Sequence, residues 1–217
     1  MSQLIFKFPF KATYFEKDFY VSSNNFAAYQ LIESCPNWPD KWINIFGPNG
    51  CGKTHLSNIL KKKISSKYII AKDIVEKDLL QIDNYDCIII DNYEENIKEK
   101  FLYSALNHYK QLNKCIVINT IKPIQKLNIN LIDLKSRFKS FIQIGIDFPT
   151  DDLLKVIISK SFSDKQIDLN TRNLEYILKN IDRSYDKVFE FIKDLDEKSL
   201  STGKSININL IKKVLNK

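Results

Sequence analysis

The sequence predicts an α/β fold, in which helices cover a parallel sheet, followed by a small all-helical domain. From about residue 42 to residue 146, short runs rich in Ile and Val alternate with helix-like segments. Apolar strands that are separated by helices indicate a parallel sheet covered on both faces. After residue 152 the strand signals stop, and only amphipathic helix patterns follow.

The elements follow in order along the chain. The expected strands are INIF (43–46), KYIIA (67–71), CIIID (87–91), CIVIN (115–119) and FIQIGI (141–146), with a helix in HLSNILKKK after the first strand. The later helices are expected in DDLLKVIISKSF, NLEYILKNI, YDKVFEFIKDLDEKSL and NLIKKVL, with N-cap residues in TDD and DLNTRN. We therefore expect three parts: an N-terminal peptide at 1–12, an α/β domain at 13–148 and a helical domain at 149–217.

The composition permits a buried core and leaves the meaning of the charge open. Hydrophobic residues make up 44% of the 217 residues, so wholesale disorder is not expected. The formal net charge is +7, which favours acidic partners such as nucleic acid. The lysines are scattered, however, which favours a simple compositional bias toward Lys, Ile and Asn as their explanation.

The cysteines and the apolar runs indicate the cellular setting. Cys35, Cys51, Cys87 and Cys115 are widely spaced, without a CxxC pair or a His–Cys cluster, which argues against a zinc site or a disulfide framework. This pattern suits a reducing, intracellular environment. The N-terminus lacks a signal-peptide pattern and no run reaches transmembrane length, so we expect a cytoplasmic protein without a membrane partner.

Residues 47–54 read GPNGCGKT and match the phosphate-loop pattern GxxxxGK[ST]. Glycines let the backbone turn several N–H groups toward a phosphate, and Lys53 can reach the β and γ phosphates. The Thr54 hydroxyl can ligate Mg²⁺, and the following helix adds its positive N-terminal dipole. An ordinary glycine turn is the alternative, but the strand before and the helix after are the context that the motif requires. The candidate nucleotide-binding residues are Gly47, Pro48, Asn49, Gly50, Cys51, Gly52, Lys53, Thr54 and His55.

A carboxylate is expected at the end of a neighbouring strand, and Asp91 follows the apolar run CIII. Together with Thr54 it would hold Mg²⁺, directly or through water. Many such ATPases place a second carboxylate next, which orients the attacking water, but residue 92 is Asn. Because an amide cannot act as a base, we expect weak or no hydrolysis by this chain unless Glu94 or Glu95 reaches the site.

These motifs resemble the AAA+ family of the bacterial replication initiator DnaA, over nearly the whole chain. The resemblance is carried by GCGKTHL, by DN after the strand and by DLKSRF at 133–138. It implies a P-loop sheet with a helical lid, and ADP or ATP with Mg²⁺ as ligands. The segment DFYVSSNNFAA is similar to the family's segment beside the adenine and adds Asn25 to the nucleotide-binding residues. Ser22 stands where the family usually has glycine.

The same resemblance gives roles to two arginines. Arg137 occupies the family's arginine-finger position, where a guanidinium stabilises charge on the γ-phosphate held by a neighbouring subunit. Arg183 corresponds to the lid's sensor arginine, which would contact the chain's own nucleotide. Each could instead be an ordinary surface arginine. At the first-sensor position the family's Ser-Asp-Arg is replaced by Thr-Ile-Lys at 120–122, so Asn119 or Thr120 substitutes for it, or the sensing step is lost.

Within the family, the sequence is most similar to the regulatory inactivators of DnaA, the Hda type. It contains neither the initiator's helix-turn-helix domain nor its long N-terminal domain, and it has Asn after the strand's Asp. The inactivators carry a QLxLxL-like peptide that docks on the replicative sliding clamp, and residues 3–8 fit it through Gln3, Leu4, Phe6 and Phe8. A strand that packs on its own domain is the alternative.

The resemblance implies a negative regulator of chromosomal replication initiation. Such a chain would bind ADP or ATP, dock on the DNA-loaded clamp and present Arg137 to ATP bound by DnaA, so its contact with DNA would be indirect. The alternatives are an adaptor or helicase-loader-like ATPase without clamp contact, an independent ATPase, and a DNA-binding protein driven by charge. The sequence leaves the oligomeric state open, with a homodimer among the possibilities.

Overall fold

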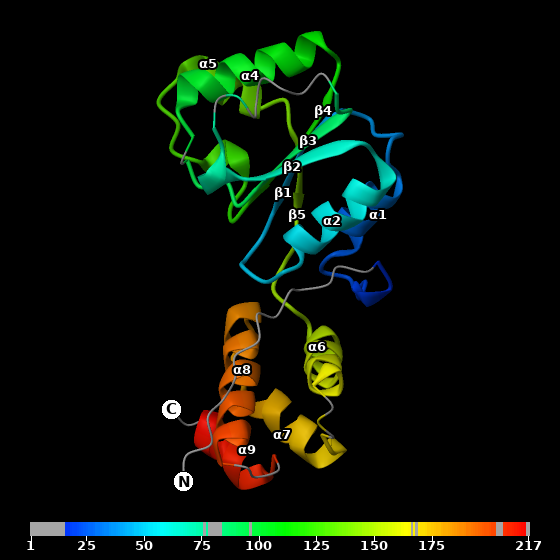
Figure 1. Ribbon diagram of the computed structural model, residues 1–217, viewed down its shortest axis with the longest axis vertical. Coiled ribbons are helices and arrows are strands. Elements are labelled where there is room, and N and C mark those ends of the chain that lie inside the picture. Colours follow the sequence, from blue (N-terminus) through cyan, green and yellow to red (C-terminus); the bar gives the residue numbers. More distant parts are fainter. Residues whose placement is uncertain are drawn as a thin grey trace. The chain divides into compact units, whose positions relative to one another are not determined.

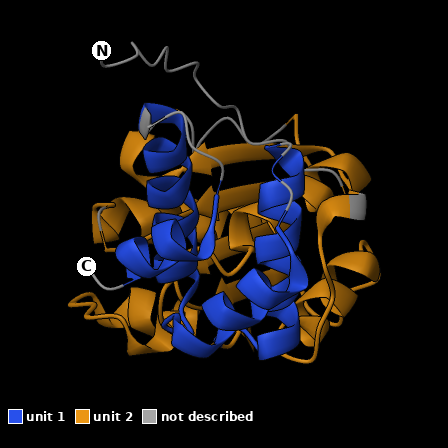
Figure 2. Cartoon of the chain, turned by 90° about the horizontal axis from the view of Figure 1, so that it is seen from below, with its two compact units in different colours: residues 1–13, 148–217 blue, residues 14–147 orange. Residues whose placement is uncertain are grey.

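The computed structural model divides into two compact units. It describes residues 16–75, 77, 84–95, 97–165, 167, 169–202 and 206–215. The sheet unit lies within Tyr14–Asp147, and the lid unit includes Phe148–Lys217 (Figure 2). In the described residues, every strand belongs to the sheet unit, and the lid unit contains only helices. The predicted α/β fold followed by a helical region is therefore confirmed.

The sheet unit is built on five parallel strands. Their bounds are β1 Trp42–Phe46, β2 Ser66–Ile70, β3 Cys87–Asp91, β4 Cys115–Thr120 and β5 Ile142–Gly145. They lie in the order β2-β3-β4-β1-β5, and each neighbouring pair is parallel. All five predicted strands are present. The second is shifted by one residue, because Ala71 opens a short 3-10 turn after the strand.

Helices cover both faces of this sheet (Figure 1). The described helical segments are α1 Phe26–Glu33, α2 Lys53–Lys63, α4 Glu99–Gln111 and α5 Ile132–Phe138, with 3-10 turns at Glu16–Asp18, Ala71–Asp73 and Ile124–Lys126. Ile88 and Ile90 of β3 pack with α4 and α5 in one core cluster. Ile89 is equally buried but points to the other face, where α2 contacts β3. Burial on both faces explains why these strands read as continuous apolar runs.

The lid unit has a core of its own. Its described helices are α6 Asp151–Asp164, α7 Thr171–Asn180, α8 Tyr185–Thr202 and α9 Ile208–Leu215. Thr150 caps α6 by accepting a hydrogen bond from Leu153 N, and Asn170 caps α7 by accepting one from Asn173 N. Both caps lie in the segments where the sequence offered N-cap residues. Apolar side chains from all four helices form one buried cluster.

The strand order brings the functional segments to one edge of the sheet. In parallel sheets, ligands bind beyond the carboxyl ends of the strands. Here β3, β4 and β1 are neighbours. Asp91 lies at the carboxyl end of β3, Asn119 lies near the carboxyl end of β4, and the loop that starts at Gly47 follows β1. Among the described residues, no helix is long and apolar enough to cross a membrane.

Candidate nucleotide site

The loop from Gly47 to Gly52 leaves β1 and turns directly into α2. Gly52 is the N-cap of α2 with φ 103°, a backbone conformation that residues with a Cβ rarely adopt. A Cβ at this position would lie 2.9 Å from Cε2 of the Phe19 ring. Because Gly52 offers no side-chain cap, the first N–H groups of α2 have no side-chain acceptor at the N-cap, the arrangement that favours an anion.

Lys53 holds a buried positive charge inside the loop. Its side chain is 5% exposed, and Nζ donates to Gly47 O at 2.8 Å and Pro48 O at 2.9 Å. The described residues give it no carboxylate partner. Nζ also donates to Cys51 Sγ at 3.7 Å. A buried ammonium that has two carbonyl oxygens and a thiol sulfur as partners retains an unneutralised charge. The loop is therefore suited to an anionic ligand that can approach Lys53.

Asp91 is the centre of a buried hydrogen-bond cluster. It is 1% exposed, and Oδ2 accepts a hydrogen bond from Thr54 Oγ1 at 2.7 Å. The Tyr68 phenol donates to the same oxygen. Oδ1 accepts from Asn119 Nδ2 at 2.7 Å and from Asn92 N at 3.1 Å. The predicted pairing of Thr54 with Asp91 is thus present in the fold, and both groups are types that Mg²⁺ takes as ligands or holds through water.

Asn119 is the residue at the first-sensor position that contacts this cluster. Its Nδ2 donates to Asp91 and also to Ser57 Oγ at 2.8 Å, while its buried Oδ1 has no hydrogen-bond partner among the described residues. Thr120 is engaged elsewhere, because its hydroxyl accepts from Asn44 Nδ2 and donates to Lys122 O. Between Asn119 and Thr120, the geometry favours Asn119, and whether a sensing step exists at this position stays a prediction.

No second carboxylate is hydrogen-bonded within the Asp91 cluster of the described residues. Asn92 is exposed and adopts φ 55°, a left-handed conformation that Asn tolerates better than most residues. The Glu95 carboxylate accepts from Asn128 N at 2.7 Å and lies 3.8 Å from Lys122 Nζ. It is therefore directed at the segment after β4 rather than at Asp91. Glu94 is exposed.

Aromatic rings pack against the other side of the loop. Phe19 stacks on Tyr29 with ring centroids 5.8 Å apart and meets the His55 ring edge-on at 5.3 Å. Asn25 is 3% exposed; it accepts from Ser22 N at 2.8 Å and donates to Tyr20 O at 2.9 Å. Asn25 thus shapes the segment beside the loop through backbone hydrogen bonds. Its direct contact with a nucleotide stays a prediction.

The two candidate arginines make contacts outside this cluster. Arg137, in the last turn of α5, is half-buried and donates from Nε to Asn107 Oδ1 at 2.9 Å. Arg183 lies between α7 and α8 and pairs with Asp151, with Nε–Oδ1 at 2.7 Å and Nη2–Oδ2 at 3.2 Å. The Arg183 guanidinium lowers the pKa of Asp151. The roles of both arginines stay predictions, and Gln3, Leu4, Phe6 and Phe8 lie outside the described residues.

Ser57 and Tyr68 belong to the Asp91 cluster but were not predicted from the sequence. Tyr68 lies on β2, which is paired in register with β3, and only this pairing places its hydroxyl near Asp91. Ser57 lies one turn into α2 and reaches Asn119 from there. No spacing rule links these positions to Asp91, so the strand order was needed to find them.

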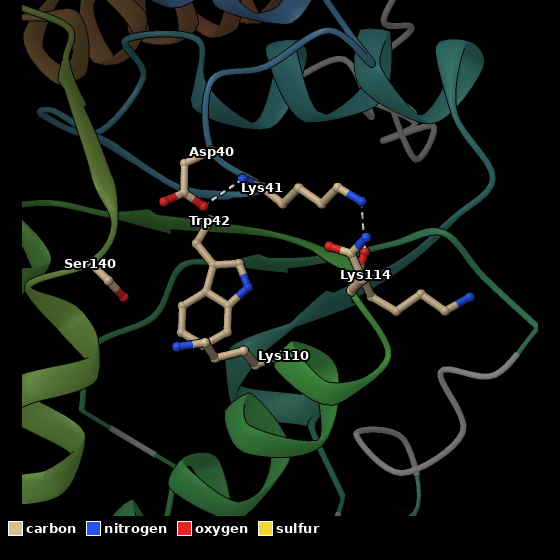
Figure 3. Close-up of a pocket in the computed structure, with 7 residues that line it drawn as sticks. Asp40, Lys41, Trp42, Lys110, Lys114 and Ser140 are labelled. Carbon is tan, nitrogen blue, oxygen red and sulfur yellow. Dashed lines mark hydrogen bonds between the residues drawn. The ribbon is translucent and has the colours of Figure 1, made fainter.

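A separate pocket of about 270 Å³ lies at the opposite edge of the sheet, by the amino ends of β1 and β4 (Figure 3). Its lining residues are Asp40, Lys41, Trp42, Lys110, Asn113, Lys114 and Ser140. None of them belongs to the phosphate loop or the Asp91 cluster. The pocket is therefore not the nucleotide site.

Comparison with known proteins agrees with this geometry. Residues 151–215 match the family described as "Hda, lid domain". The replication initiator DnaA of Spiroplasma citri is 28% identical over 203 residues, covering 80% of this chain and 45% of that protein. DnaA of Borrelia garinii is 27% identical over 265 residues, covering 97% of this chain and 54% of that protein.

Solved structures show the same fold. Domain III of DnaA from Thermotoga maritima superposes with a TM-score of 0.79 at 21% identity, over 96% of this chain and 98% of that one. The chain is therefore similar to DnaA over nearly its whole length, shares the fold of DnaA domain III, and has a C-terminal segment similar to the Hda lid. The RuvB branch-migration motor of T. maritima, a more distant match, has a TM-score of 0.66 at 20% identity over 89% of this chain and 67% of that one. This DnaA-like chain spans about half the length of the curated relatives it matches.

Proposed function

We propose that this DnaA-like chain is a negative regulator of chromosomal replication initiation. It binds ADP or ATP with Mg²⁺, docks on the DNA-loaded sliding clamp through residues 3–8, and presents Arg137 to ATP bound by DnaA. The observation that carries the proposal is the match of residues 151–215 to the Hda lid family. The similarity to DnaA supports a general role in replication initiation more strongly than it supports the specific inactivator mechanism.

Nucleotide binding is supported by the contents of the phosphate loop and by related structures. Lys53 is buried without a described carboxylate partner, and Thr54 and Asp91 are already hydrogen-bonded to each other. A solved structure of DnaA from Aquifex aeolicus, with a TM-score of 0.68, is described as bound to AMPPCP. A nucleotide bound here would place its phosphates at the N-terminus of α2, within reach of Lys53.

A regulatory rather than self-hydrolysing role is supported by the surroundings of Asp91. The position after Asp91 holds Asn92, which supplies no base, and Glu95 is engaged by Asn128 N and Lys122. Hydrolysis of a P-loop nucleotide requires a group that orients the attacking water. A chain that holds ATP without this group keeps its nucleotide, which suits a protein whose target is the ATP of another subunit.

Arg137 is supported as the residue that acts on that other ATP. It is only half-buried, and the one hydrogen bond that the described residues give its guanidinium joins Nε to the neutral side chain of Asn107. A guanidinium without a carboxylate partner keeps its charge available to a phosphate. An arginine supplied in trans accelerates phosphoryl transfer by roughly 10³- to 10⁵-fold in well-studied systems.

The proposal is tested by phosphate release from ATP-loaded DnaA in the presence of clamp loaded on DNA. Wild-type chain should accelerate release, and Arg137→Ala should remove the acceleration. Lys135→Ala is the matched control, because Lys135 is an exposed cation on the same helix. A control that loses as much as Arg137→Ala would indicate a general charge effect and contradict the finger assignment.

The clamp contact is tested separately by deleting residues 1–8. The deletion should abolish clamp binding and clamp-dependent acceleration while leaving nucleotide binding unchanged. If the deleted chain still accelerates release, the clamp step is wrong. If the wild-type chain binds clamp but never accelerates release, the adaptor or helicase-loader-like alternative replaces the inactivator.

A further inference from the structure

Two buried cysteines face each other at the start of neighbouring strands. Cys87 opens β3 and Cys115 opens β4, and the two are register partners in the parallel pair. Register partners in a parallel pair point to the same face, with strands roughly 4.8 Å apart. This separation is within the Cα–Cα range of about 4.4–6.8 Å that a disulfide can bridge. Both cysteines are free thiols, with Cys87 fully buried and Cys115 6% exposed.

The two thiols are chemically unequal. The hydrogen bond from the Cys87 thiol lowers the pKa of Cys115 and correspondingly raises that of Cys87. Burial opposes the change at Cys115, while the nearby Lys41 ammonium adds to the lowering. Cys115 is also the more exposed of the two, at 6% against 0% for Cys87, so it is the thiol that an oxidant reaches first. Cys87 remains protonated beside it and can act as the second, resolving thiol.

Charges of both signs surround Cys115: the Lys41 ammonium lowers its pKa, whereas the Asp86 carboxylate raises it. Lys41 precedes β1, and its carbonyl accepts from Ile116 N at 2.8 Å, next to Cys115 in β4. The Lys41 ammonium donates to Asn113 O at 2.9 Å, on the rim of the pocket that Lys114 also lines (Figure 3). The half-buried Cys35 also interacts electrostatically with Cys115. Cys35 is therefore the competing partner that an experiment has to separate from Cys87.

We propose that Cys87 and Cys115 form a redox-active pair that hydrogen peroxide converts into a disulfide between β3 and β4. The Cys115 thiolate attacks one peroxide oxygen, forming an S–O bond and breaking the O–O bond, and the released hydroxide takes a proton to become water. The Cys87 sulfur then attacks the Cys115 sulfenic acid. The S–S bond forms, the S–O bond breaks, and the second water leaves with the Cys87 proton. Two electrons pass from the thiols to one peroxide.

The pair lies on the same two strands as the nucleotide site. Asp91 follows Cys87 by four residues, and Asn119 follows Cys115 by four residues. The inference nevertheless does not rest on the proposed function, because the chemistry concerns the amino ends of β3 and β4 alone. It adds a modification site to a protein whose cysteine spacing alone gave no indication of one.

Peptide mapping of the full chain after graded peroxide treatment tests this proposal. Cys51 is the internal control. Its exposed fraction of 4% is similar to the 6% of Cys115, but burial raises the pKa of Cys51. Because the pKa of Cys115 is lowered while that of Cys51 is raised, Cys115 should be oxidised faster than Cys51. Non-reducing mass spectrometry should show a Cys87–Cys115 linked peptide that dithiothreitol removes. Equal oxidation of Cys51 and Cys115, or no linked peptide, would overturn the proposal.

Two variants separate the partners. Cys35→Ser should still form the Cys87–Cys115 linkage, whereas Cys87→Ser should stop at a Cys115 sulfenic acid that dimedone traps. Circular dichroism before treatment confirms that each variant is folded, and the wild-type mapping stands without them. A dominant Cys35–Cys115 linkage in the wild type would show that Cys87 is not the resolving thiol and contradict the assignment.

Discussion

The Asp91 cluster and the two candidate arginines differ in how firmly the fold holds them. Asp91 is 1% exposed and accepts hydrogen bonds from two hydroxyls, an amide side chain and a backbone N–H. Arg137 is half-buried with one neutral described partner, and the Arg183 side chain is 56% exposed. The difference indicates that the side chains of the proposed nucleotide site are already in place. The arginines, by contrast, keep the exposure that a contact with another group requires.

Removal of the loop lysine should have the largest effect on the proposed nucleotide site. Lys53→Ala deletes the buried ammonium that would meet the nucleotide phosphates. A lost charge-assisted contact costs about 3 kcal/mol, so the Kd for ADP should rise roughly a hundredfold. Isothermal titration calorimetry measures the Kd for ADP, and Lys62→Ala on the same helix is the control. Equal affinities in wild type and Lys53→Ala would mean that the loop does not hold phosphate.

The glycine that starts α2 should be next in magnitude. Gly52→Ala places a Cβ on a residue with φ 103° and 2.9 Å from Phe19 Cε2. The backbone strain should lower the free energy of unfolding by about 2 kcal/mol, measured by urea denaturation without nucleotide. In a Phe19→Ala background the close contact disappears but the strained φ remains. Most of the loss should therefore persist there, and full recovery would show that the contact alone is responsible.

Tyr68→Phe should have a smaller effect, because Asp91 keeps its other donors. The substitution removes one hydroxyl from Asp91 Oδ2 while Thr54 still donates to that oxygen. A single hydrogen bond contributes about 1 kcal/mol to stability. Tyr103→Phe, on α4, controls for the loss of a phenol away from Asp91. Identical unfolding curves for Tyr68→Phe and wild type would mean that this contact adds nothing to the cluster.

The exposed ion pair of the lid should give the smallest effect. Arg183 lowers the pKa of Asp151 below its ordinary value of 3.8, so folding favours the ionised carboxylate. The stabilisation is present above this value and is lost as the pH falls through the lowered folded pKa. Wild type should have a slightly higher Tm than Asp151→Asn at neutral pH, and the difference should vanish under acidic conditions. A difference that persists in acid would have another cause.

The sequence predicted those parts of the fold that depend on local pattern. Strand runs such as CIIID and CIVIN, the caps at Thr150 and Asn170, and the phosphate loop each have their signal within a few residues. These signals are the side-chain period, the capping hydroxyl or amide, and the glycine spacing. Each of these elements appears in the structure where the pattern placed it.

The parts that depend on strand order were not predictable in the same way. The sequence left open whether Asn119, Thr120 or neither occupies the sensor position. The β3–β4 pairing brings Asn119 to Asp91, while Asn44 engages Thr120. Tyr68 reaches Asp91 from β2 for the same reason. The pairing of Arg183 with Asp151 joins the start of α6 to the loop before α8. Local periodicity carries no information on such long-range neighbours.

The most direct test of the central claim, that the site holds a nucleotide without consuming it, is single-turnover conversion of bound ATP by the purified chain with Mg²⁺. Wild type should retain its ATP intact, and Asn92→Asp, which adds a carboxylate next to Asp91, should convert it to ADP faster. Rapid conversion by wild type that Lys53→Ala abolishes would instead establish an independent ATPase and contradict the account.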